Sequence, residues 1–89
     1  MSWKLNKNGV TPQRQLMDAE QQRLNDFMNA IRGEGLHPAE SARNARCEYK
    51  KLKGTDNQYE IYLSEKNRAT FTVDEESQTV TMLQVGGHT

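Results

Sequence analysis

The fold of this chain is decided by residues 59–85, YEIYLSEKNRATFTVDEESQTVTMLQV, in which apolar and polar side chains alternate. Alternate residues of 59–63 and of 68–73 form an apolar set, which is the period of a strand with one buried face. The polar breaks at 64–67 and 74–77 are short, so successive strands should pair as antiparallel hairpins. These residues predict an antiparallel meander with one apolar face.

The meander is expected to begin near Arg46, where the hydrophobic period changes to two, and to end with a strand over 80–85. In that last strand Gln84 interrupts the alternation and predicts a β-bulge. The second face of the middle strands should stay open to solvent. It carries these side chains: Glu60, Tyr62, Arg68, Thr70 and Thr72.

The N-terminal part of the chain is predicted to be helical. Thr11-Pro12 combines a hydroxyl N-cap with a proline at the first helical position, so a helix should begin there. Apolar residues recur at helical spacing over 16–31, and Gly33 provides a C-terminal stop. His37-Pro38 begins a second, shorter helical segment that continues through Ala45. We expect an α+β fold in which the N-terminal helices pack on one face of a small antiparallel β-sheet.

Composition limits the class of protein. A length of 89 residues predicts a single domain over 1–89 with one modest core. The mean hydropathy is −0.98, no apolar run approaches the length of a membrane span, and residues 1–4 lack the apolar core of a signal peptide. The lone Cys47 has no partner for an internal disulfide. We therefore expect a cytoplasmic protein without a membrane partner.

Charge is balanced overall but not locally. The twelve basic and twelve acidic side chains give a net charge of zero, whereas residues 43–53 hold five basic side chains and one acidic side chain, Glu48. The basic ones are Arg43, Arg46, Lys50, Lys51 and Lys53. Such a strip suits a local groove that contacts phosphates. The alternative is a solvated helix end followed by a strand edge.

No common catalytic or cofactor motif is present. The chain lacks a phosphate-binding glycine-rich loop, a GxSxG or HExxH motif, and any Cys/His spacing typical of zinc. We expect no metal and no cofactor. Metal-free RNA cleavage instead needs a base for the 2′-hydroxyl, a cation for the developing phosphorane charge, and an acid for the leaving 5′-oxygen.

The residues near the basic strip can supply these three roles. Arg68 suits charge stabilisation, because a guanidinium is always ionised and matches phosphate oxygens. Lysine or histidine can transfer protons, and the aromatic ring of Tyr49 or Tyr62 can stack on an unpaired base. The alternative for Arg68 is a cross-strand pair with Glu60, and for the tyrosines it is ordinary strand propensity.

The order of these features resembles the RelE/ParE superfamily of small bacterial toxins. Over residues 12–89 the chain has two helices, then Leu52-Lys53-Gly54 before a tyrosine-led strand, a short hairpin, and Arg68 opening the next strand. The position of Tyr62 is basic in many members of that family. The resemblance implies a RelE-like fold and a toxin of a toxin-antitoxin system.

For the site, the resemblance implies Lys51 or Lys53 as the base, Arg68 as the phosphate clamp and His88 as the acid. We expect RNA contacts from a second set of residues: Arg46, Tyr49, Lys50 and Tyr62. The implied activity is metal-independent endoribonucleolytic cleavage of mRNA, in the ribosome, with a cognate antitoxin as inhibitor. The alternatives are a DNA gyrase inhibitor of the ParE type and an inactive module that binds an antitoxin.

Overall fold

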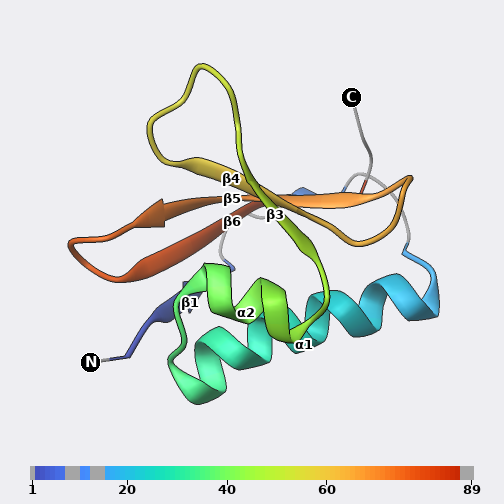
Figure 1. The fold of residues 1–89 in the computed structure, drawn as a ribbon, viewed down its shortest axis with the longest axis horizontal. Coiled ribbons are helices and arrows are strands. Elements are labelled where there is room, and N and C mark those ends of the chain that lie inside the picture. The colour runs from blue at the N-terminus through green and yellow to red at the C-terminus, as the bar shows by residue number, and fades with distance from the viewer. Residues whose placement is uncertain (1, 8–10, 13–15, 87–89) are drawn as a thin grey trace.

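The computed structural model describes residues 2–7, 11–12 and 16–86, which form two helices and a mixed sheet (Figure 1). The elements, in chain order, are β1 (Lys4–Asn6), β2 (Thr11–Pro12), α1 (Asp18–Glu34), α2 (Pro38–Asn44), β3 (Glu48–Lys51), β4 (Gln58–Tyr62), β5 (Arg68–Asp74) and β6 (Thr79–Val85). Both helices lie on the same side of the sheet in Figure 1. The predicted α+β class, with helices packed on one face of a sheet, is confirmed.

The sheet has the strand order β1-β6-β5-β4-β3, and β2 also pairs with β6. Strands β3 to β6 form the predicted antiparallel meander. The register shifts between Thr70 and Phe71, which confirms an irregularity where Gln84 interrupts the alternation of β6. Strands β1 and β2 run parallel to β6, so the sheet is mixed and the prediction of a purely antiparallel sheet was wrong. Parallel pairing is possible here because the two helices provide the crossover between β1 and the meander.

The predicted helix start at Thr11-Pro12 was wrong. These two residues form β2, with Thr11 opposite Gln84 and Pro12 opposite Val85, and α1 begins only at Asp18. The backbone N–H of Met17 donates to the Glu20 carboxylate at 2.8 Å, which satisfies one of the unpaired groups at the helix start. Pairing with β6 therefore prevailed over a local sequence that also suits a helix start.

Helix α1 ends two residues later than predicted, because Gly35 and not Gly33 is its stop. Gly33 remains inside it, and Gly35 adopts the left-handed conformation with φ 69° and donates to the Ile31 carbonyl at 2.9 Å. A Cβ atom on Gly35 would lie 2.8 Å from the Cβ of Ser2. The close approach of the N-terminal segment, as well as the left-handed turn, therefore requires glycine at this position.

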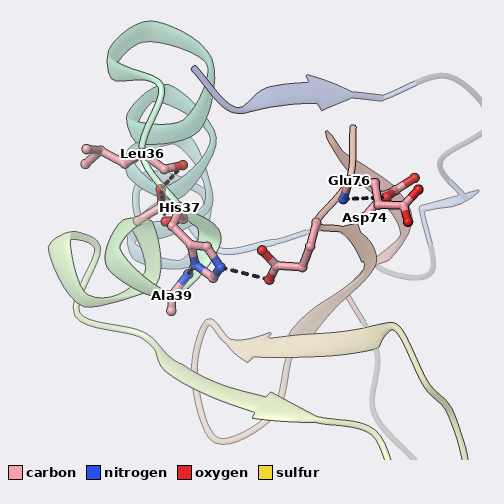
Figure 2. A network of polar contacts seen from close by, with 7 residues as sticks. Leu36, His37, Ala39, Asp74 and Glu76 are labelled. Carbon is pink, nitrogen blue, oxygen red and sulfur yellow. Dashed lines mark hydrogen bonds and ion pairs between the residues drawn. The ribbon is translucent and has the colours of Figure 1, made fainter. Parts of the chain in front are cut away.

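Helix α2 begins at the predicted place, with His37 as its N-cap. The His37 Nδ1 accepts the backbone N–H of Ala39 at 3.0 Å, and Nε2 lies 3.1 Å from the Glu75 carboxylate in the β5–β6 turn. Figure 2 shows the imidazole between the helix start and this turn. The ring also packs edge-on against Trp3, with 4.8 Å between centroids. His37 thus joins three segments that are distant in sequence.

The hydrophobic core lies between the helices and the covered face of the sheet. Phe27 of α1 packs against Phe71 of β5, with ring centroids 5.2 Å apart, and both are fully buried. The other fully buried side chains of large volume include Ile31, Ile61, Leu63, Val80 and Met82. The apolar set predicted for β4 and β5 therefore faces the helices. No helix in the described ranges is long and apolar enough to cross a membrane.

Candidate functional site

The candidate site lies on the open face of the sheet, which is the face that carries Arg68 and is turned away from the helices. Cross-strand register places Lys50 of β3 opposite Glu60 of β4, and Tyr62 of β4 opposite Arg68 of β5. Because side chains directly opposite each other share a face, and residues two apart on one strand also do, these four side chains lie together. We call Lys50, Glu60, Tyr62 and Arg68 the open-face cluster.

An ion pair lies at the centre of the open-face cluster. The Arg68 Nη1 donates to the Glu60 Oε2 at 2.6 Å, with 16% of the arginine side chain and 6% of the glutamate side chain exposed. A charged pair shielded to this degree is held more firmly than a surface pair, and removing either partner leaves a desolvated charge. The cross-strand pair that the sequence offered as an alternative for Arg68 is therefore present.

Tyr62 lies beside two cations on the open face. The Lys50 Nζ is 5.5 Å from the centre of the Tyr62 ring, and the Arg68 guanidinium carbon is 6.0 Å from it. Both distances allow a cation–π attraction. The Lys50 ammonium also lies 3.6 Å from the carboxylate of Glu48, at the exposed edge of the sheet. The cluster thus combines a half-buried aromatic ring with two groups that attract phosphate.

The lysines predicted as bases lie elsewhere. Lys51 pairs with Tyr59 in the register of β3 and β4, so it belongs to the same face as Tyr59, opposite to that of Arg68. Lys53 follows the strand in an exposed turn. The structure therefore places Lys50 on the face of Arg68, with both cations beside the Tyr62 ring, and places Lys51 on the other face. His88 lies outside the described residues.

The two remaining predicted RNA contacts also lie away from the open-face cluster. Tyr49 is half-buried on the helix side, stacked on Tyr59 at 5.1 Å and tilted against Phe71 at 6.1 Å. Burial raises the pKa of the Tyr49 phenol, and the neighbouring Tyr59 phenol and Glu75 carboxylate raise it further. Arg46 is exposed after α2, in the left-handed conformation with φ 60°. Tyr49 therefore contributes to core packing.

The arrangement supplies elements that RNA chemistry can use. A guanidinium has five N–H donors in a planar fork and can contact a carboxylate and a phosphate together. A half-buried tyrosine ring offers a surface on which an unpaired base can stack. Among the described residues, no group of three His, Cys, Asp or Glu side chains is placed to hold a metal ion.

Glu60 is the residue of this cluster that the sequence did not nominate for a functional role. It is 4% exposed and lies on a face that was expected to be open. Its closeness to Arg68 depends on the register between β4 and β5, which alternation alone does not give. One sequence signal could have identified it. Glu60 lies between Tyr59 and Ile61 in a strand, and it is two positions from Tyr62, which belongs to the same face.

No protein-family model matches this chain, and no curated protein matches it at a significant level. The resemblance to the RelE/ParE superfamily thus rests on the order of short motifs alone.

Proposed function

We propose that this protein is a RelE/ParE-like toxin that acts as a metal-independent endoribonuclease on mRNA. The observation that supports the proposal is the grouping of Arg68, Tyr62 and Lys50 on the sheet face that is turned away from the helices. A single-stranded RNA segment would lie across this face. One phosphate would contact Arg68 and the next base would stack on Tyr62.

The partners follow from the same proposal. Ribosome-bound mRNA is the substrate, a cognate antitoxin is the inhibitor, and the cytoplasm is the place of action. The balanced charge of the chain is compatible with a short contact, since only a few phosphates need to be neutralised at one cleavage site. Lys51, Lys53 and His88 stay predictions for proton transfer and positioning.

A cleavage assay tests this function. The purified protein is incubated with free single-stranded RNA in EDTA, and then with ribosome-bound mRNA in magnesium, and the new RNA ends are analysed. We expect cleavage of free RNA to persist in EDTA and to leave 2′,3′-cyclic or 3′-phosphate ends, because the 2′-hydroxyl is the nucleophile. Products with 3′-hydroxyl ends, or the absence of cleavage on both substrates, would contradict the proposal.

A second candidate function is a module of the same fold that binds a protein and cleaves nothing, such as a gyrase inhibitor of the ParE type. The observation that favours it is the Arg68–Glu60 ion pair. A guanidinium that already has a carboxylate partner can stabilise the fold without binding a phosphate. Induction in bacteria separates the two candidates. Growth arrest with inhibited DNA supercoiling and unchanged RNA ends supports this second function.

A further inference from the structure

A carboxylate lies next to the predicted phosphate clamp, on the same face of the sheet. Glu60 accepts a hydrogen bond from Arg68 at 2.6 Å and is shielded from solvent. The other carboxylate on this part of the open face is Glu48, which is opposite Tyr62 in the register, 61% exposed, and 3.6 Å from Lys50. Glu60 and Glu48 therefore share a face and a charge but differ in burial and partner.

We propose that Glu60 is the general base of the endoribonuclease, with Arg68 holding both the carboxylate and the scissile phosphate. This inference rests on the function proposed above. It follows from placement: Glu60 is a proton acceptor bonded to Arg68, whereas Lys51 belongs to the opposite face and Lys53 to an exposed turn. A base must lie within hydrogen-bond reach of the proton that it removes while the phosphate contacts its clamp.

The protonation states agree with this assignment. A carboxylate is ordinarily ionised at neutral pH and can accept a proton, whereas an exposed lysine amine carries one already. The hydrogen bond from the adjacent guanidinium, at 2.6 Å, fixes the orientation of the Glu60 carboxylate. Tyr62 lies opposite Arg68 in the register, so a base stacked on its ring would position the attached ribose near both groups.

The reaction step is a transesterification. Glu60 takes the proton from the ribose 2′-hydroxyl, the 2′-oxygen forms a bond to phosphorus, and the bond from phosphorus to the 5′-oxygen breaks. A water molecule gives its proton to the leaving 5′-oxygen, and the resulting hydroxide takes the proton back from Glu60. The products are a 2′,3′-cyclic phosphate and a 5′-hydroxyl end. Arg68 stabilises the negative charge that gathers on the phosphorane oxygens.

The experiment compares Glu60→Gln with Glu48→Gln, which removes the same charge from the same face. Single-turnover cleavage and equilibrium binding are measured with one RNA, the binding assay using a 2′-deoxy substitution that prevents cleavage. We expect Glu60→Gln to slow cleavage about 10²- to 10⁴-fold while RNA binds as tightly as before or more tightly. Glu48→Gln should leave the cleavage rate within about two-fold, because it removes no group that transfers a proton.

The cleavage rate and the binding affinity, measured on the same variant, distinguish a general base from a residue that only supports the structure. If Glu60→Gln cleaves as fast as the parent protein, Glu60 is not the base. If it loses binding and cleavage in parallel, Glu60 only supports Arg68. If the parent cleaves no RNA in either assay, the proposed function itself fails, which is a different result.

The pH profile of the parent protein keeps the proposal testable if Glu60→Gln fails to fold. A carboxylate base predicts a cleavage rate that falls in the acidic range as the carboxylate is protonated and is level toward alkaline pH. A lysine base predicts a rate that keeps rising into the alkaline range. Such a rise would overturn the proposal, and Glu60→Asp, which retains a carboxylate, should keep the shape of the parent profile.

Discussion

The junction between α1 and the β4–β5 turn and the open face of the sheet each bury one glutamate, Glu20 and Glu60, at 5% and 4% exposure. Glu20 accepts the N–H of Met17, the hydroxyl of Ser64 and the amide of Asn67 at 2.9 and 3.0 Å. Glu60 accepts from the guanidinium of Arg68. The partners of Glu20 named here are neutral, whereas the partner of Glu60 carries a full charge. Similar burial of a carboxylate can thus serve two purposes.

The junction with Glu20 fixes the fold. Its hydrogen bonds tie the start of α1 to the turn that joins β4 and β5, and the Arg23 guanidinium donates to the Leu63 carbonyl at 2.7 Å in the same region. The pair of Glu60 and Arg68 instead lies on the open face, opposite to the face of Ile61 and Phe71 that packs on the helices. In the proposed function, an RNA phosphate competes there for the guanidinium. We therefore expect substitutions in the first region to change stability alone, and those in the second to change activity as well.

The largest effect is expected for Arg68→Ala. Loss of the phosphate clamp should slow RNA cleavage about 10²- to 10³-fold. The change also leaves Glu60 with a desolvated charge, so the free energy of unfolding should fall by about 2–4 kcal/mol, somewhat less than for a fully buried pair because Arg68 is partly exposed. Chemical denaturation gives the stability, and single-turnover cleavage is measured below the unfolding transition. If the folded variant cleaves at the parent rate, Arg68 is only structural.

Glu20→Ala should change stability without changing chemistry. It removes the acceptor for the groups of Met17, Ser64 and Asn67, so we expect a loss of about 2–3 kcal/mol in the free energy of unfolding. Asp26→Ala on the same helix is the matched control, since its exposed bond from Gln22 is worth only about 0.2–0.5 kcal/mol. Cleavage per folded molecule should equal that of the parent. A large loss of cleavage activity per folded molecule would show that the two regions are coupled.

A smaller effect is expected for the Tyr62 ring. Tyr62→Ala should weaken RNA binding by about 1–3 kcal/mol, as for loss of a stacked base, while Tyr62→Phe should keep the affinity because stacking needs the ring and not the hydroxyl. Tyr62→Arg should steepen the salt dependence of binding by about one unit. Fluorescence anisotropy at several salt concentrations measures all three variants. Equal affinity for all of them would remove Tyr62 from the open-face cluster as an RNA contact.

The meander could be predicted from sequence because its signal is local. Apolar residues such as Ile61 and Phe71 recur with period two between short polar breaks, and this pattern determined both the strands and their buried face. Strands β1 and β2 could not be predicted, since a strand of two or three residues depends on its pairing with β6. Thr11-Pro12 has the same local chemistry whether it begins a helix or pairs with a strand.

The candidate site could be predicted in part. Alternation placed Tyr62 and Arg68 on one face, which the register of β4 and β5 confirms. The register of β3 was not available from sequence, and it is this register that puts Lys50 on the face of Arg68 and Lys51 on the other. The proximity of Glu60 to Arg68 likewise depends on two strands and the rotamers of long side chains. Composition gives neither the register of β3 nor the contact between Glu60 and Arg68.

An NMR titration of the ¹⁵N-labelled protein with a single-stranded RNA, made uncleavable by 2′-deoxy substitution, shows directly whether RNA binds the open face of the sheet. We expect the largest shift changes at Lys50, Tyr62 and Arg68 and at the Arg68 side-chain N–H groups, with little change at Phe27 and Ile31 in α1. Shift changes concentrated on the helices, or none at concentrations where cleavage proceeds, would contradict this expectation.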